Sequence, residues 1–233
     1  MFIRKDFKYE PKEIGDIIWG NSESRLRIED IVSGTEALPY CGKSAILLYG
    51  VFGTGKTTLA KMLPNAIEKG ITGQGITLPE AFIGCQQGFN GPQVMVLIEN
   101  VLNKVSLNES GLHYFILDEV DNLTKLAQQS LKSALNTDRG IFILTTNNIS
   151  ELDKGLKDRC VLVEMNAAPV SDYLPIARNL VSEMGAVMSD TDLLPTITAA
   201  NGSLRNLIHN VERLVRRKNL PPLSVIFKES LND

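Results

Sequence analysis

The sequence of 233 residues predicts an α/β fold, in which a parallel β-sheet carries helices on both faces and a small all-helical domain follows. Three observations lead to this prediction. Apolar runs with strand character alternate with amphipathic helical segments as far as residue 165. A glycine-rich segment of fixed spacing joins the first apolar run to the first helical segment. Beyond residue 166 only helical patterns remain.

The first expected strand is Ala45–Tyr49, and the segment after it matches the phosphate-binding pattern G-x-x-x-x-G-K-[ST]. The matching residues, with the threonine that follows them, are Gly50, Val51, Phe52, Gly53, Thr54, Gly55, Lys56, Thr57 and Thr58. Glycine lets the backbone curl around a phosphate without a Cβ in the way, and a helix N-terminus offers unpaired N–H groups. We therefore expect this P-loop to bind a nucleoside triphosphate, with Lys56 reaching the β- and γ-phosphates and Thr57 binding Mg²⁺.

A helix is expected to open at Thr57, directly after the P-loop. Because strand, pattern and helix are all present, a glycine-rich turn that binds nothing is the weaker interpretation. Pro64 lies seven residues after Thr57. Proline has no N–H to donate and clashes with the preceding turn, so we expect Pro64 to end or kink this helix early.

Four further strands are expected, at residues 81–85, 114–117, 141–145 and 160–163. Helical patterns lie between them, one opened by Gly91-Pro92-Gln93 and one at residues 124–135. We expect the resulting P-loop sheet domain to span residues 1–165. Helical patterns at 171–184, 190–200 and 203–218 predict a second domain at 166–220. A tail at 221–233 follows, and its apolar residues are expected to pack on the protein or to meet a partner.

Polar side chains follow the third and fourth expected strands directly. A carboxylate beside the P-loop, Asp118, is placed to hold the water shell of Mg²⁺, and the next one, Glu119, to orient and deprotonate an attacking water. Asn147 follows the fourth strand, where its amide can hydrogen-bond the γ-phosphate and the water. An acidic pair that caps a strand and an asparagine in a turn are the alternatives. The preceding P-loop favours a site that hydrolyses its ligand.

The composition limits the remaining classes of function. With 43% apolar and 22% charged residues the chain is typical of globular proteins, and no apolar run is long enough to span a membrane. The cysteines Cys41, Cys85 and Cys160 lack the paired spacing of a zinc site. They indicate free thiols in the core or at an interface, and hence a reducing cytoplasm. A net charge of −3 means that any DNA contact needs a local basic patch or several assembled copies.

Five further segments are similar, in order, to motifs of one family. They are Lys8-Tyr9-Glu10-Pro11 with Ile17-Ile18-Trp19-Gly20-Asn21, then Leu117-Asp118-Glu119-Val120-Asp121 with Ala127-Gln128-Gln129-Ser130-Leu131, then Asn147, Asp158-Arg159-Cys160 and Gly202-Ser203-Leu204-Arg205. With the P-loop they make the chain resemble the AAA+ ATPases. Within that class it resembles clamp-loader subunits, namely the small subunits of replication factor C and their phage and bacterial relatives. Glu10 and Asp158 depart from the arginine and serine of the family motifs.

This resemblance implies an ATP hydrolase that uses Mg²⁺. It implies that Tyr9, Pro11 and Ile18 lie against the adenine and that the helical domain forms a lid whose Arg205 holds the γ-phosphate. It also implies that Arg159 reaches the ATP of a neighbouring subunit, so that the protein works as a homo- or hetero-oligomer. For each arginine the alternative is a surface residue in a salt bridge.

The resemblance further implies that ATP hydrolysis loads or remodels a protein on DNA, with a sliding clamp as the first candidate partner and no membrane involved. Lys125, Lys132 and Arg139 are candidate DNA contacts, and solvated surface residues are the alternative. Two other functions stay open: a different DNA-associated AAA+ ATPase, of the helicase-loader or branch-migration type, and a non-hydrolysing ATP-binding scaffold in a hetero-oligomer. The helical collar domain that follows the lid in this family has no counterpart in the given sequence. Three explanations stay open: the subunits assemble through their AAA+ modules alone, the sequence is part of a longer protein, or the protein is not a clamp loader.

Overall fold

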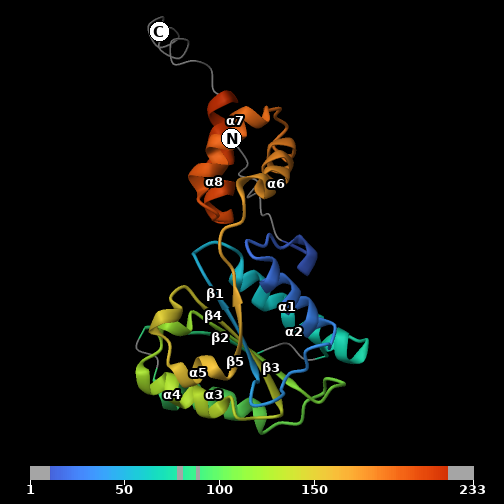
Figure 1. Ribbon diagram of the computed structural model, residues 1–233, viewed down its shortest axis with the longest axis vertical. Coiled ribbons are helices and arrows are strands. Elements are labelled where there is room, and N and C mark those ends of the chain that lie inside the picture. Colours follow the sequence, from blue (N-terminus) through green and yellow to red (C-terminus); the bar gives the residue numbers. More distant parts are fainter. Residues whose placement is uncertain (1–10, 78–80, 88–89, 220–233) are drawn as a thin grey trace, which may run out of the picture. The chain divides into compact units, whose positions relative to one another are not determined.

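The computed structural model describes residues 11–77, 81–87 and 90–219 (Figure 1). They form two compact units, one of residues 11–166 and one that begins at Ala167. The predictions for Tyr9 and for the tail at 221–233 lie outside the described residues. Within the described part of the chain, no helix has both the length and the apolar character that a membrane crossing requires.

The first unit is built on a five-stranded sheet with the strand order β2-β3-β4-β1-β5. The strands are β1 (Ala45–Tyr49), β2 (Ala81–Gly84), β3 (His113–Asp118), β4 (Gly140–Thr146) and β5 (Cys160–Glu164). Every neighbouring pair is parallel, which confirms the predicted sheet. All five carboxyl ends therefore lie at one end of the sheet, and β2 and β5 are its edge strands.

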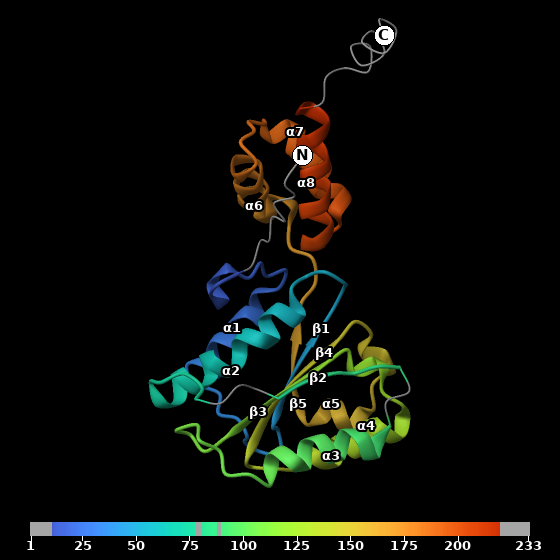
Figure 2. The ribbon, with the colours of Figure 1, turned by 180° about the vertical axis from the view of Figure 1, so that it is seen from behind.

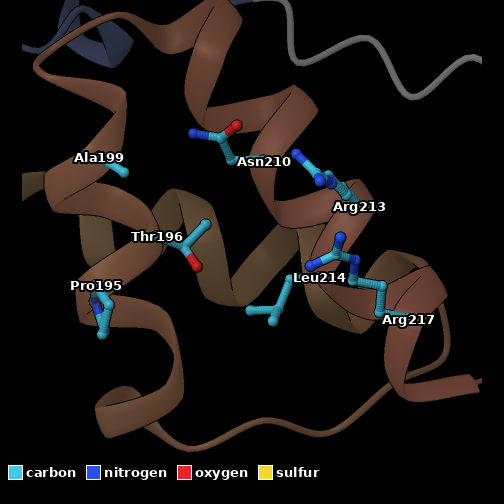
Figure 3. A pocket seen from close by; sticks show the side chains of 7 residues that line it. All are labelled: Pro195, Thr196, Ala199, Asn210, Arg213, Leu214 and Arg217. Atoms are coloured by element: carbon cyan, nitrogen blue, oxygen red, sulfur yellow. The ribbon is translucent and has the colours of Figure 1, made fainter.

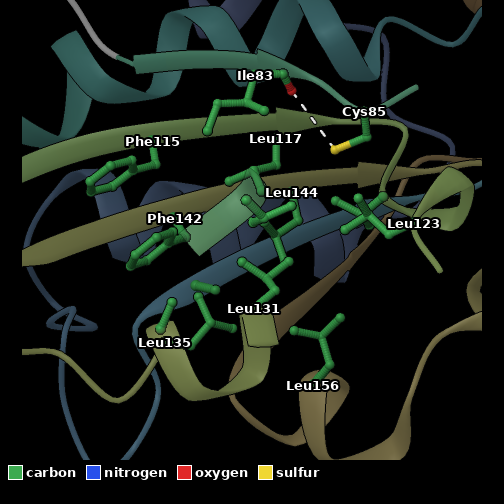
Figure 4. Close-up of a cluster of buried hydrophobic side chains, with 14 of the residues drawn as sticks. Ile83, Cys85, Phe115, Leu117, Leu123, Leu131, Leu135, Phe142, Leu144 and Leu156 are labelled. Carbon is green, nitrogen blue, oxygen red and sulfur yellow. Dashed lines mark hydrogen bonds between the residues drawn. The ribbon is translucent and has the colours of Figure 1, made fainter. Parts of the chain in front are cut away.

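Helices cover both faces of the sheet (Figure 2). One face packs α1 (Ser22–Val32) and α2 (Lys56–Thr72), and the other packs α3 (Gly91–Leu102), α4 (Lys125–Ala134) and α5 (Lys154–Asp158). Successive side chains of a strand point to opposite faces, so Ile46 joins the first apolar cluster and Leu47 the second. In the second cluster the rings of Phe115 and Phe142 stack with centroids 4.6 Å apart (Figure 4). Burial on both faces explains why the strands read as continuous apolar runs.

The structure corrects the expectation that Pro64 ends its helix early, because α2 continues to Thr72. A proline inside a helix costs about 3 kcal/mol. Leu63 and Ile67 beside it are fully buried, and burying such side chains contributes roughly 1.5–3 kcal/mol each. Packing against the sheet therefore outweighs the lost hydrogen bond, and α2 ends instead at the left-handed Gly73. Helices α1 and α5 were not expected from the sequence.

The second unit is helical in its described residues, as predicted, with α6 (Val170–Glu183), α7 (Asp190–Ala200) and α8 (Leu204–Asn219). The hydroxyl of Tyr173 donates to the carbonyl of Gly202 and accepts from the amide of Ala168, at 3.2 and 3.1 Å. These bonds tie the start of the unit to the α7–α8 turn. Between α7 and α8 lies an open hollow of about 310 Å³ (Figure 3), lined by Pro195, Thr196, Ala199, Asn210, Arg213, Leu214 and Arg217.

Candidate nucleotide-binding site

The P-loop leaves the carboxyl end of β1 and enters α2. Its glycines Gly50, Gly53 and Gly55 have positive φ angles of 141°, 79° and 94°. A Cβ added to Gly50 would lie 2.5 Å from the carbonyl oxygen of Met165, so no larger residue fits there. A Cβ on Gly55 would meet nothing within 4 Å, which shows open space above the loop. The loop thus needs glycine for its backbone, and it leaves room for a ligand at the start of α2.

Lys56 is the first residue of α2 and is only 7% exposed. Its ammonium group donates to the carbonyl oxygens of Gly50 and Val51, at 2.9 and 2.6 Å, so the side chain folds back over the P-loop. A cation at a helix N-terminus meets the positive end of the helix dipole, which is unfavourable by itself. Bound phosphate groups would reverse that balance, because they complement both the ammonium group and the helix N-terminus.

Asp118 ends β3 and lies next to Thr57 of α2. The Thr57 hydroxyl donates to Asp118 Oδ1 at 2.9 Å, and the hydroxyl of Thr145 on β4 donates to the same oxygen at 2.6 Å. A carboxylate and a hydroxyl side by side are the oxygen ligands that Mg²⁺ prefers. The residues present therefore fit a magnesium ion at this place. Thr145 was not identified as a site residue from the sequence, where it looks like the polar end of an apolar run.

Glu119 follows β3 with a left-handed backbone, φ 60° and ψ 53°. For a residue with a side chain this conformation costs roughly 1–2 kcal/mol and persists only where the surroundings enforce it. Here the Glu119 amide donates to Thr145 Oγ1 at 2.9 Å, and the side-chain amide of Asn122 donates to the Glu119 carboxylate at 3.2 Å. The same Asn122 nitrogen also donates to the Cys85 carbonyl. Asn122 is the second site residue that the sequence did not reveal.

Negative charge is concentrated around these two carboxylates. Burial, and with it the negative charges of Asp118, Asp121 and Glu119, raise the pKa of the Cys85 thiol to about 12. Among the described residues, Oδ1 of Asp121 is a buried oxygen without a hydrogen-bond partner. A negatively charged end of the sheet, with a carboxylate oxygen that lacks a partner, attracts a cation. This is a second reason why the residues fit a magnesium ion bound together with phosphates.

Asn147 follows β4 and is partly buried. Strands β3 and β4 are paired in parallel, with Leu117 opposite Leu144. Asn147 therefore emerges at the same end of the sheet as Asp118 and Glu119. The structure thus brings the P-loop, both carboxylates and Asn147 to one end of the first unit.

Arg159 lies at the opposite end of the sheet, immediately before β5. The pairing sets Cys160 beside Ala45, so Arg159 is level with the start of β1, whereas the P-loop leaves from its end. A strand rises about 3.3 Å per residue, and β1 has 5 residues, which separates Arg159 from its own P-loop by roughly 16 Å or more. Its guanidinium donates from Nε to Asn136 Oδ1 at 2.8 Å and from a terminal nitrogen to the Gly155 carbonyl at 2.9 Å.

The other predicted residues are more dispersed. Pro11 and Ile18 are partly buried in the first unit, and Phe52 is 69% exposed on the P-loop. Thr54 is buried, and its hydroxyl donates to the Val51 carbonyl at 3.1 Å. Arg205 belongs to the second unit, where it is exposed in the first turn of α8.

Comparison with known proteins gives a consistent result. Residues 46–166 match the model of the family described as "ATPase family associated with various cellular activities (AAA)". The chain is 27% identical over 208 residues to replication factor C small subunit 2 of Pyrobaculum islandicum, covering 88% of this chain and 61% of that protein. It is also 27% identical over 212 residues to the probable replication factor C subunit 2 of Dictyostelium discoideum, covering 88% and 58%. The chain therefore spans about three fifths of the length of these relatives.

Among solved structures, the fold is similar to the RuvB Holliday junction branch migration motor of Thermotoga maritima. The TM-score is 0.65 at 18% identity, over 88% of this chain and 64% of that one. At this level of identity the likeness concerns the fold alone. It confirms the predicted arrangement of a P-loop sheet followed by a helical region.

Proposed function

Because this chain belongs to the AAA family of ATPases, we propose that it hydrolyses ATP as one subunit of an oligomer that loads or remodels a protein on DNA. One observation carries the proposal. The P-loop, Asp118 and Glu119 lie at the carboxyl end of the sheet, whereas Arg159 lies at its amino end. A single chain therefore carries the nucleotide-binding part of one site and the arginine of a second site. A neighbouring copy or a related subunit would supply what each site lacks.

In the proposed site the P-loop amides and Lys56 hold the β- and γ-phosphates of ATP, and Thr57 and Asp118 hold Mg²⁺. Mg²⁺, when bound, neutralises charge on the phosphates. Glu119 orients the attacking water and accepts its proton on the side-chain carboxylate, while Asn147 hydrogen-bonds the water and the γ-phosphate. The water oxygen forms a bond to the γ-phosphorus while the bond from that phosphorus to the oxygen bridging the β- and γ-phosphates breaks, and ADP and phosphate leave. The left-handed Glu119, held from both Thr145 and Asn122, supports this role.

Two arginines complete the proposed site. Arg159 comes from the neighbouring subunit and stabilises charge on the transferring phosphoryl group, a contribution of about 10³–10⁵ in rate for such arginines. Arg205 comes from the same chain and contacts the γ-phosphate, with the helical unit acting as a lid. An exposed cation in the first turn of α8 is unfavourable for the helix dipole, and a phosphate partner explains it. Tyr9, Pro11 and Ile18 are proposed to contact the adenine.

DNA and a sliding clamp are proposed as partners on the strength of the replication factor C relatives. The structure bears on the candidate DNA contacts. The Lys125 ammonium donates to the Glu151 carbonyl, and Lys132 forms an ion pair with Asp153 at 3.5 Å. Arg139 is exposed. Lys125 and Lys132 would have to exchange these contacts for phosphate before they could bind DNA.

The experiment that tests the proposal measures the steady-state ATPase rate against protein concentration, with and without primer–template DNA, for the wild type and Arg159→Ala. We expect the rate per chain to rise steeply with concentration, to respond to DNA and to fall at least about 10³-fold in Arg159→Ala. A rate that is flat in concentration and indifferent to Arg159 would show that each site works within one chain, and the proposal would be abandoned. No turnover at any concentration, with ATP still bound, would favour the scaffold alternative.

A further inference from the structure

The guanidinium of Arg159 is held by two contacts within its own chain, and one of them comes from a side chain. Asn136 follows α4 and accepts a hydrogen bond from Arg159 Nε through Oδ1, at 2.8 Å. We propose that Asn136 is a positioning residue that aims Arg159 at the ATP of the neighbouring subunit. This inference rests on the proposed function, because it assigns a role only if Arg159 acts across the subunit boundary.

The main chain at Arg159 is already fixed without Asn136. Lys43 donates from its ammonium group to the carbonyls of Asp158 and Cys160, both at 2.9 Å, and the Ser44 amide donates to the Arg159 carbonyl. Strand β5 begins at the next residue, paired with β1. The long Arg159 side chain is therefore the part whose direction remains to be set, and a partly exposed arginine has many rotamers.

The two contacts leave the reactive end of the guanidinium available. Arginine has five N–H donors in a planar fork. One is used by Asn136 from Nε, and one by the Gly155 carbonyl from a terminal nitrogen. Within the part of the chain that the structure describes, three donors therefore remain on the terminal nitrogens, which suits contact with phosphate oxygens. Holding Nε and one terminal nitrogen fixes the plane of the group, so a bound γ-phosphate would meet an arginine that is already oriented.

Asn136 fits a positioning role because its side chain is exposed and lies outside both apolar clusters. Its side-chain bond to Arg159 bridges 23 positions in the sequence. An aspartate at this position would keep an acceptor oxygen, whereas a leucine of similar volume would remove it. The pair Asn136→Leu and Asn136→Asp therefore separates loss of the hydrogen bond from loss of the side chain.

The test uses the full chain and measures ATPase kinetics for Asn136→Leu, Asn136→Asp and Arg159→Ala. We expect Asn136→Leu to lower kcat about tenfold and leave the KM for ATP within about twofold, since only the arrangement in the transition state changes. Asn136→Asp is expected to retain most of the wild-type rate. Ser133→Ala is the matched control, because Ser133 is exposed on the last turn of α4 and, among the described residues, its hydroxyl hydrogen-bonds only the Gln129 carbonyl. It should behave as wild type.

A mixing experiment shows whether the defect acts across subunits. Glu119→Gln subunits have an inactive site of their own but an intact Arg159, so equal amounts of Glu119→Gln and Asn136→Leu should be more active together than the two proteins apart. Arg159→Ala mixed with Glu119→Gln sets the reference for such rescue. The inference is overturned if Asn136→Leu stays within about twofold of wild type while Arg159→Ala is inactive, or if mixing rescues Arg159→Ala but not Asn136→Leu. A fully active Arg159→Ala would instead overturn the proposed function.

Discussion

At the scale of single residues, Thr145 joins the parts of the candidate catalytic site. The residue is only 2% exposed, and its hydroxyl donates to the Asp118 carboxylate and accepts from the Glu119 amide. It thereby links the last residue of β3, the left-handed turn after it and the strand that leads to Asn147. The sequence pattern drew attention to Asn147, two positions further on, because an amide at a strand end is chemically suggestive. A threonine at the polar end of an apolar run carries no such signal.

Replacing Thr145 by valine should lower kcat by about 10–100-fold with little change in ATP binding. The change removes two buried hydrogen bonds at nearly constant shape, and one such group left unsatisfied costs about 1–3 kcal/mol, where 1.4 kcal/mol is tenfold. Thr145→Ser keeps the hydroxyl and should stay within a few-fold of wild type. Steady-state kinetics and titration with a fluorescent ATP analogue measure both quantities. Equal rates for the valine and serine variants would show that the hydroxyl does not matter.

The three cysteines should differ sharply in reactivity towards a thiol reagent. Burial raises the pKa of both Cys85 and Cys160 to about 12, while Cys41 is exposed. Because the thiolate is the nucleophile, only about 10⁻⁴ of each buried thiol is reactive at pH 8. Titration with Ellman's reagent should find one fast thiol per native chain and three in denaturant. A Cys41→Ser variant should show no fast thiol, and a second fast thiol in the wild type would contradict the assignment.

At the scale of elements, packing against the sheet decides where helices begin and end. Helix α2 passes through Pro64 because the side chains next to it are buried against the strands. Helix α7, by contrast, is secured at its start by local polar contacts. Ser189 caps it, Arg178 of α6 donates from Nε to Asp190 at 2.9 Å, and Lys218 of α8 donates to Asp192 at 2.8 Å. Two partly exposed ion pairs therefore link α7 to its neighbouring helices, in addition to the buried apolar side chains of the unit.

The stability of the helical unit should fall in acid for this reason. Hydrogen bonds from Arg178 lower the pKa of Asp190, and those from Lys218 and Ser189 lower the pKa of Asp192. A carboxyl group whose pKa is lower in the folded state stabilises it fully above the unfolded pKa, near 3.9, and this contribution is lost as the pH falls through the folded value. Thermal unfolding of the wild type should therefore shift to lower temperature below about pH 4.

The double variant Asp190→Asn, Asp192→Asn is the control for this prediction. It should be less stable than the wild type at pH 7 and should lose less stability on acidification, so that the two melting curves converge at low pH. Circular dichroism during heating measures the melting temperature of both proteins at each pH. Curves that stay parallel down to pH 2 would show that the two carboxylates do not contribute.

At the scale of the whole molecule, the chain consists of two units with separate apolar cores. Both clusters that cover the sheet lie within residues 11–166, and their last member is Met165. The buried side chains Leu193, Leu207 and Val211 belong to the helical unit. Each unit thus buries apolar surface of its own, which is the condition for folding alone.

A fragment of residues 1–166 should accordingly fold, unfold cooperatively on heating and still bind ATP. It contains the sheet, the P-loop and both carboxylates, and among the described residues neither apolar cluster of the sheet has a member beyond Met165. Its ATPase rate should be lower than that of the full chain, since it lacks Arg205. Calorimetry tests whether the fragment unfolds cooperatively, and titration with a fluorescent ATP analogue tests whether it binds ATP. A fragment that melts without a cooperative transition would show that the first unit depends on the second.

Residues close together along the chain were sufficient to predict the P-loop, the strand before it and the helix after it, the acidic pair after β3 and the helical character of the second unit. Their signals are local, because phosphate binding, strand burial and helix periodicity are each written within a few neighbouring residues. Strand order, the contact of Thr145 with Asp118 and the contact of Asn136 with Arg159 were decided only by the tertiary structure. These features join positions more than 20 residues apart, and the packing of both sheet faces, which no local pattern encodes, brings them together.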